Sequence, residues 1–487
     1  MDTSRQNGFG TFTALIRTLA ALATLVIALL PDAAQAVPAF NRQTGQNCLA
    51  CHAGGQFPEL TPYGRMFKMT GYTFGERTIP ISAMAVTSFS SVANTSKTDN
   101  PGQDFQKNNT GIFATASLFL AGKVTNNIGA FAQITFDPYA TQAADGSFHG
   151  HSNADNIDIR YADRFITPQQ DLIVGISGNN NPSVSDPWNT AAAWMQYVPV
   201  PSPTGSRFID GNAPYPGYGS GGNVAGMTAY AYWNQTLYLE LGGYRTSKGV
   251  FSFMSKGLDD ASTTKLQGTN PYWRVALNHE WGANSLMVGT SGMVAHVFDD
   301  PLNISDPAST HRFRDIGADA QYQYLLDPHS VTAQIAFINT QHQYPAALAG
   351  QPAPFFDASG AATLANTNAT DTTNIVRAKL TYVYQARYGG SLGLFSLTGS
   401  VNTANQTAGY DNTGTLVRTA GPSSSLSGSL STRGYTLEAF WTPIQYLRLG
   451  AQYTGHTRFN GASTNYDGFR RNARDNNTLF LYAWLAY

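Results

Sequence analysis

Cys48, Cys51 and His52 are the residues of this chain whose types and spacing most directly indicate chemistry. They form the motif C-x-x-C-H, and the two thiols are the only cysteines among the 487 residues. Two thiols at this spacing can add across the two vinyl groups of one haem, and the adjacent imidazole can then bind the iron as its proximal ligand. The motif therefore predicts one covalently attached haem c, with His52 as a metal ligand.

Two other kinds of site also use closely spaced cysteines. A structural zinc site needs a second Cys/His pair, and none lies close to residue 52 in the sequence. A redox dithiol usually belongs to a thioredoxin-like βαβ unit, and no such pattern follows the motif. The absence of both patterns favours haem attachment.

The start of the chain predicts export from the cytoplasm. Export is consistent with the motif, because haem c is attached outside the cytoplasm. Arg5 and Arg17 form a short basic region, residues 19–30 are an apolar run, and Ala34-Gln35-Ala36 matches a small-x-small cleavage site. We expect residues 1–36 to be a signal peptide. An uncleaved membrane anchor is the alternative, but the apolar run is short for a bilayer core.

The composition favours a membrane-spanning β-barrel for the rest of the chain. Charged residues make up 12% of the sequence, against about 25% in an ordinary soluble protein. Aromatic residues also reach 12%, and no later segment has eighteen continuous apolar residues. The formal net charge of −1 gives no electrostatic support for nucleic-acid binding.

Residues 37–78 read as a separate small unit that carries the haem motif. Thr61 is placed as an N-cap, Pro62 as the first residue of a helix and Gly71 as its stop. About forty residues are too few to surround a haem and also bury a core of their own. We therefore expect this unit to plug the lumen of a barrel formed by residues 79–487.

The sequence beyond residue 79 alternates with a period of two, as strands do. In residues 236–245, Leu237 and Leu239 share one face, whereas Tyr238 and Glu240 share the other. The same alternation recurs in four further segments: residues 315–324, 374–384, 435–441 and 447–453. Segments of this length and pattern are typical of transmembrane β-strands.

Short turns and long polar links alternate between these strands. The short turns are at residues 126–127, 167–169, 234–235, 281–284, 326–329, 387–389 and 443–445. The long links are at residues 94–110, 138–155, 179–222, 247–269, 299–311, 343–373, 403–431 and 458–475. This asymmetry predicts about sixteen antiparallel strands, with periplasmic turns, extracellular loops and both barrel ends in the periplasm.

Charged residues on the polar strand faces are expected to line the lumen. They have two interpretations, an ordinary porin interior of mixed charge or a clamp for the haem-bearing plug. The residues are Arg160, Arg164, Glu240, Arg274, Glu280, Asp315, Asp319, Arg377, Lys379, Glu438 and Arg448.

The residues on both sides of the haem motif resemble one protein family. Residues 38–47, PAFNRQTGQN, are similar to the mature start of the outer-membrane monohaem cytochrome–porin fusions, the iron oxidases of iron-oxidising bacteria. Residues 58–68, PELTPYGRMFK, resemble the segment after their haem. The resemblance covers about residues 37–75 and extends to the remainder in architecture only.

The resemblance implies an enzyme, an Fe(II) oxidase of the cell outer membrane. Extracellular Fe(II) would give one electron through the haem to a periplasmic carrier, either a cytochrome c or a blue copper protein. Composition and periodicity do not indicate iron oxidation. The alternatives are a solute porin with a structural or regulatory haem-bearing plug, and a soluble periplasmic haem-bound β protein.

Met66 is the first candidate for the distal haem ligand and Met69 the second. A thioether ligand raises the potential of a haem, which suits an acceptor of electrons from Fe(II). His279, His296 or an open coordination site are the alternatives. Both methionines could instead fill gaps between a small helix and the barrel wall.

Arg65 and Lys68 lie on the same predicted helix as the methionines. Each could bind a haem propionate, and the pair is therefore a candidate part of the cofactor site. They could equally form a solvated helix face.

Residues 148–155 form a predicted surface loop that holds His149, His151 and Asp155. Imidazole and carboxylate groups both suit iron, so this loop could capture Fe(II). A polar loop without a ligand is the plainer interpretation.

Overall fold

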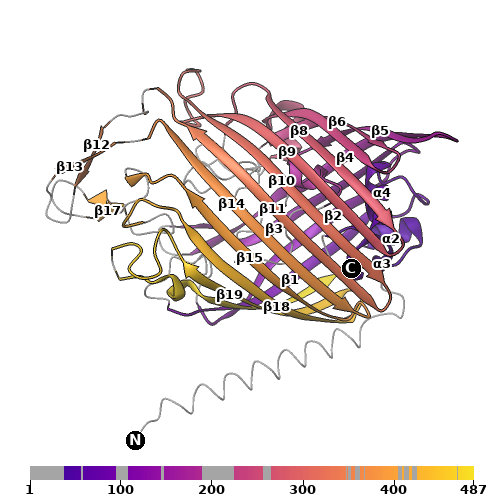
Figure 1. Ribbon diagram of the computed structural model, residues 1–487. Coiled ribbons are helices and arrows are strands. Elements are labelled where there is room, and N and C mark those ends of the chain that lie inside the picture. The colour runs from indigo at the N-terminus through magenta and orange to yellow at the C-terminus, as the bar shows by residue number, and fades with distance from the viewer. Residues whose placement is uncertain are drawn as a thin grey trace, which may run out of the picture.

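The wall of the barrel is built from the strands that the alternating pattern predicts. The computed structural model places them in one closed barrel of sixteen antiparallel strands, which confirms the predicted fold class (Figure 1). The structure describes residues 38–55, 59–94, 108–143, 147–188, 224–255, 265–346, 348, 352–356, 362–366, 368–403, 409–410, 416–418, 425–468 and 470–487. The predicted signal peptide, residues 1–36, lies outside the described residues.

Neighbouring strands of the barrel follow the order of the chain. The last strand, β20, pairs with β1, as in the pair Met84↔Ala486, and this pairing closes the barrel. The strands are β1 (Ile81–Val92), β2 (Gly111–Lys123), β3 (Ile128–Gln142), β4 (Phe148–Thr167), β5 (Gln170–Asn179), β6 (Val224–Trp233), β7 (Leu237–Thr246), β8 (Asn270–Trp281), β9 (Asn284–Phe298), β10 (Thr310–Leu326), β11 (His329–Gln343), β14 (Thr370–Tyr384), β15 (Tyr388–Gly399), β18 (Thr432–Ile444), β19 (Leu447–Arg458) and β20 (Thr478–Ala486).

The short turns all lie at one end of the barrel, which we call the short-turn end. Their predicted positions are confirmed to within a few residues. At Asn234 and Gln235 both residues have positive φ, 49° and 53°, which is the hairpin geometry that matches the twist of the flanking strands. The first residues of β1 and the last residues of β20 also lie at this end of the barrel.

The barrel exposes its apolar face and buries its polar face. On β7, Leu241 is 66% exposed, whereas Glu240 is only 3% exposed and points into the lumen. The same inversion holds on β10, where Ile316 is exposed and Asp319 is buried. Aromatic side chains are also exposed beside the short turns, namely Trp233, Trp281, Tyr384, Tyr388 and Trp441. An apolar outer band with an aromatic girdle suits a lipid environment.

The N-terminal segment forms a small helical unit at the short-turn end (Figure 1). Its elements are α2 (Pro38–Thr44), α3 (Cys48–Cys51), the 3₁₀ turn η1 (Ala53–Gly55) and α4 (Pro62–Met69). The predicted start of α4 is confirmed, since the Thr61 hydroxyl accepts the backbone N–H of Gly64. The helix ends at Met69, and Gly71 follows with φ 76°. In the described part of the chain, no helix is long and apolar enough to cross a membrane.

The long links contain more structure than the sequence indicates. Two of them contribute to a separate four-stranded sheet of β12 (Pro352–Phe356), β13 (Ala362–Asn366), β16 (Gly409–Tyr410) and β17 (Leu416–Arg418). Others contain the short elements α5 (Pro182–Ser185), η3 (Gly249–Met254) and η4 (Ala473–Asn476).

Candidate haem-attachment site

The two cysteines of the C-x-x-C-H motif lie on one short helical turn. Cys48 and Cys51 begin and end the single turn of α3, so both side chains lie on one side of the helix. Asn47 caps this turn, and its side chain accepts the backbone N–H of Ala50. The two thiols are not joined in a disulfide. Burial and the neighbouring Cys48 raise the pKa of Cys51 to about 11, so this thiol is protonated at neutral pH.

His52 follows α3 directly and leaves the helix with extended backbone angles, φ −121° and ψ 133°. Its backbone N–H donates to the carbonyl oxygen of Cys48 at 2.8 Å, and it pairs with Leu60 across an isolated β-bridge. Burial lowers the pKa of the imidazole to about 4, although a hydrogen bond with the Glu59 backbone acts in the opposite direction. The neutral ring is the form that binds a metal. The thiols and this imidazole therefore fit a haem c.

Helix α4 packs closely against the motif because of one glycine. A Cβ atom at Gly64 would lie 2.1 Å from the backbone oxygen of Cys51, so a larger residue would push the two helices apart. The backbone N–H of Thr61 donates to the same oxygen at 2.9 Å. The two helices thus form one rigid unit around the motif.

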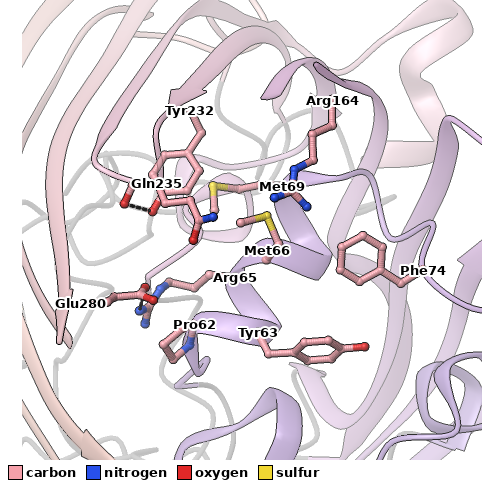
Figure 2. A pocket seen from close by; sticks show the side chains of 10 residues that line it. All are labelled: Pro62, Tyr63, Arg65, Met66, Met69, Phe74, Arg164, Tyr232, Gln235 and Glu280. Atoms are coloured by element: carbon pink, nitrogen blue, oxygen red, sulfur yellow. Dashed lines mark hydrogen bonds and ion pairs between the residues drawn. The ribbon is translucent and has the colours of Figure 1, made fainter. Parts of the chain in front are cut away.

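A cavity of about 350 Å³ opens beside α4 (Figure 2). Met66, Met69 and Tyr63 all line it. Burial and the nearby Cys51 thiol raise the pKa of the Tyr63 phenol. Met69 is 1% exposed and packs in an aromatic cluster, whereas Met66 is partly exposed at its edge. His52 does not line this cavity. The full lining is Pro62, Tyr63, Arg65, Met66, Met69, Phe74, Arg164, Tyr232, Gln235 and Glu280.

The two histidines considered as distal ligands lie on strands of the barrel wall. His279 is on β8, is exposed and stacks on Trp281 at 5.2 Å between ring centroids. His296 lies near the far end of β9 and pairs with Arg312 in the strand register. The choice between Met66, Met69, either histidine and an open site stays a prediction.

Arg65 is buried against the barrel wall, so its interpretation as part of a solvated helix face is wrong. Its guanidinium donates to the backbone oxygen of Leu60 at 3.0 Å and to the Gln323 side chain at 2.8 Å. It also donates to the Ser285 hydroxyl at 2.7 Å and forms an ion pair with Glu280 at 3.3 Å. These contacts fasten α4 to β8, β9 and β10.

Lys68 is buried as well, and the solvated interpretation is equally wrong for it. Its ammonium donates to the backbone oxygen of Asp186 at 2.9 Å. Burial lowers the pKa of this ammonium to about 8. The role of Arg65 and Lys68 as propionate partners stays a prediction.

Further contacts hold the helical segment inside the barrel. Lys379 forms an ion pair with Glu59 at 2.8 Å. The Tyr72 hydroxyl donates to the Asp158 carboxylate at 2.6 Å. The clamp interpretation of the lumen charges therefore holds for Lys379 and Glu280.

Other predicted lumen charges form ion pairs within the barrel wall. Arg160 pairs with Asp158 at 2.7 Å, Arg274 with Asp319 at 2.6 Å and Arg448 with Glu438 at 3.0 Å. Three more are buried: Glu240, Asp315 and Arg377. Arg164 instead pairs with Asp171 at 2.6 Å and is about one third exposed beside the cavity.

The sequence did not reveal that residues 181–188 fold into the lumen. They belong to the link predicted over residues 179–222, and the structure buries them beside the helical segment. Asn181 caps α5, and Trp188 then packs against Tyr238 with ring centroids 5.3 Å apart. The Trp188 carbonyl oxygen accepts a hydrogen bond from the Gln321 side-chain amide at 2.8 Å. The local signal was the Asn-Asn-Pro sequence of a capped turn, which gives no direction in space.

The predicted histidine loop is wrong, because residues 148–155 belong to strand β4. His151 pairs with Asp137 and His149 with Thr141 in the strand register. In the residues that the structure describes, no group of three or more His, Cys, Asp and Glu could hold a metal ion. The Fe(II)-capture interpretation of this segment therefore has no supporting geometry.

Comparison with known proteins yields only remote structural similarity. No protein-family model matches the chain, and no curated protein matches it. Solved structures that resemble it include the Salmonella typhi OmpF complex with daunomycin, with 9% identity and a TM-score of 0.43, covering 84% of this chain and 97% of that one. The outer membrane channel DcaP of Acinetobacter baumannii has 10% identity and a TM-score of 0.44, covering 84% and 96%. Pseudomonas putida OprB has 11% identity and a TM-score of 0.45, covering 84% and 93%.

Proposed function

We propose that the protein is an outer-membrane barrel that carries one haem c in its periplasmic mouth and passes electrons across the membrane. The observation that carries the proposal is the placement of Cys48, Cys51 and His52. The thiols share one helical turn, the neutral imidazole follows it, and the whole segment is clamped inside the barrel. The apolar outer band supports membrane insertion.

Different residues of the chain would have different roles in holding the cofactor. Cys48 and Cys51 would form the two thioether bonds, and His52 would bind the iron. Bound haem supplies one-electron oxidation and reduction. Gly64 keeps α4 against the motif, and Arg65 fixes α4 to the wall.

We propose extracellular Fe(II) as the electron donor and a periplasmic cytochrome c or blue copper protein as the acceptor. The resemblance of residues 37–75 to outer-membrane iron oxidases carries this part of the proposal. The physical reason for such a design is that ferric iron is poorly soluble. The product stays outside the cell when only the electron crosses.

The test is stopped-flow mixing of the purified, oxidised full-length protein with Fe(II), followed at the Soret band of the haem. We expect reduction of the haem by Fe(II) and complete reduction by dithionite. The apoprotein variant Cys48→Ala/Cys51→Ala is the control for unspecific colour changes. If dithionite reduces the wild-type haem but Fe(II) leaves it oxidised at every pH tested, Fe(II) is not the electron donor. The proposal that the protein carries a haem would still stand.

The second candidate is a solute porin with a structural or regulatory haem-bearing plug. The closed sixteen-strand barrel favours it, since barrels of this size can enclose an aqueous channel. The plug lies in the lumen at the short-turn end, and residues 181–188 fold into the lumen and contact it, which opposes free passage. Steady conductance of the wild-type protein in planar bilayers would support the porin, and a closed baseline would support the electron carrier.

Fractionation separates both candidates from a soluble periplasmic haem protein. The outward apolar face of β7 and its neighbours would be unfavourable in water. We therefore expect the protein in the outer-membrane fraction, with heat-modifiable mobility on denaturing gels. Recovery in the periplasmic fraction would contradict both candidates.

A further inference from the structure

A short apolar element lies on the outside of the barrel, after strand β7. The 3₁₀ turn η3, Gly249–Met254, contacts β4 and β6 rather than the lumen. Its Met254 is buried in a cluster with Ala154, Ile157 and Ala225. The position of this cluster decides on which side of the wall η3 sits.

The cluster belongs to the outer face of the wall. Ile157 and Ile159 alternate along β4 with Asp158 and Arg160, whose side chains bind each other in the lumen. Ile159 is 38% exposed on the outer face, but Ile157 is only 4% exposed, because η3 covers it. The link after β7 therefore turns back over the outside of β4 and β6.

Three large apolar side chains of η3 point away from the barrel. Val250 is 83% exposed, Phe251 39% and Phe253 51%. The backbone N–H of Phe251 donates to the Lys248 carbonyl at 3.2 Å, which fixes the turn that presents them. Contact of these side chains with water is unfavourable, whereas contact with acyl chains is favourable.

Cationic side chains border the same patch. Arg245 pairs with Ala225 in the strand register, so it lies on the outer face beside Met254, and it is exposed. Lys248 precedes η3 and is exposed too. Apolar side chains bordered by an arginine and a lysine match a lipid that has acyl chains below a phosphorylated headgroup.

We propose that η3, together with Arg245 and Lys248, is a binding site for a phosphorylated lipid of the outer leaflet. The patch continues the apolar outer band of the barrel, where Ile134 and Ile159 are exposed, and the long links place it at the extracellular edge of that band. Met254 anchors the turn, Val250, Phe251 and Phe253 contact acyl chains, and the two cations bind phosphate. The inference rests on the membrane location in the proposed function and is independent of the haem.

The first test places a reporter in the patch of the full-length protein. The variant Phe253→Trp is reconstituted in vesicles of phosphatidylcholine with lipid A. The fluorescence of the wild-type protein is subtracted, so that the signal of the added tryptophan remains. Brominated acyl chains should quench the new tryptophan, and aqueous iodide should not. The matched control is Ile304→Trp, at an exposed apolar position of another long link, which iodide should quench.

A second control separates this inference from the membrane location. Leu241→Trp lies on the outer face of β7 and should be quenched by brominated chains in any membrane-inserted barrel. Loss of quenching at both positions would overturn the membrane location itself. Quenching at Leu241→Trp, with Phe253→Trp open to iodide, would overturn only the lipid site. Protection from both quenchers, with oligomers that Phe253→Ser dissolves, would assign the patch to a second copy of the chain instead.

The third test addresses the phosphate. Arg245→Gln/Lys248→Gln should bind lipid A about thirtyfold more weakly than the wild type, at roughly a tenfold or smaller loss per cation. Binding of phosphatidylcholine, whose headgroup has no net charge, should change little. Equal retention of lipid A by both proteins would overturn the phosphate contact.

Discussion

The ammonium of Lys68 lies 2.9 Å from the backbone oxygen of Asp186, and this contact joins the N-terminal helical segment to the segment that folds inward after β5. The Asp186 carboxylate faces Arg274 at 3.6 Å, and Arg274 binds Asp319 at 2.6 Å. Helix α4, residues 181–188 and the wall are thus connected by one buried polar network. A change at one end of it is expected to loosen the plug.

Lys68→Met should weaken the seating of the plug in the barrel. The variant keeps the aliphatic volume but loses a hydrogen bond of a charged group, which is worth about 1.5–3 kcal/mol when buried. Relief of the buried charge offsets part of this loss. We expect roughly tenfold more frequent opening events in planar bilayers.

Arg458→Met is the matched control for this experiment, because it also removes a positive charge, at an exposed position. It should leave the conductance baseline unchanged. Indistinguishable traces for Lys68→Met and the wild type would show that Lys68 does not hold the plug.

Removal of either thiol should prevent normal haem attachment. Cys48 and Cys51 are the only cysteines of the chain, so no other thiol can replace them. Cys48→Ala or Cys51→Ala should abolish or sharply weaken the band on a haem-stained denaturing gel. The double variant Cys48→Ser/Cys51→Ser is the control in which the side chains keep a similar size but lack the thiols. Bands of full strength in the single variants would refute the attachment site.

Substitution of the two cavity methionines should have different consequences. Met69 is fully buried in the aromatic cluster, so Met69→Ala should destabilise the protein by about 2–5 kcal/mol through loss of packing. Met66 lines the same cavity but is less buried, so Met66→Ala should cost less stability. If Met66 binds the iron, its loss should lower the haem potential markedly, since a thioether stabilises ferrous haem.

Spectroelectrochemical titration of both variants beside the wild type distinguishes these roles. Met66→Leu is the control for cavity filling without a sulfur ligand, and it should lower the potential as Met66→Ala does. A lowered potential in Met69→Ala alone would move the ligand to Met69. Unchanged potentials in all three variants would leave the sixth position to another group.

The long links should be accessible from outside the cell. A protease added to intact cells should cut within residues 179–222 or 403–431, although parts of both lie outside the described residues. A cleavage site engineered at the short turn of residues 168–169 should remain protected until the outer membrane is permeabilised. Cutting only at the short turn would reverse the orientation of the barrel.

The sequence by itself determined the barrel and the haem motif. The alternation of Leu237, Tyr238, Leu239 and Glu240 is a local property with a period of two, and each strand face follows from it. The turns were equally local, as at Asn234-Gln235, where two residues fix the hairpin. The spacing of Cys48 and Cys51 places both on one side of any helical turn, so their arrangement followed without knowledge of the surroundings.

Only the tertiary structure decided what surrounds the motif. Lys68 and Asp186 are 118 positions apart, and Arg65 and Gln323 are 258 positions apart. Closure of the barrel brings such pairs together, and no local pattern encodes the direction in which a link folds afterwards. For the same reason, residues 181–188 and η3 both appeared as polar links. One folds into the lumen and the other onto the outer wall, because each buries its few apolar side chains against the surface that it can reach.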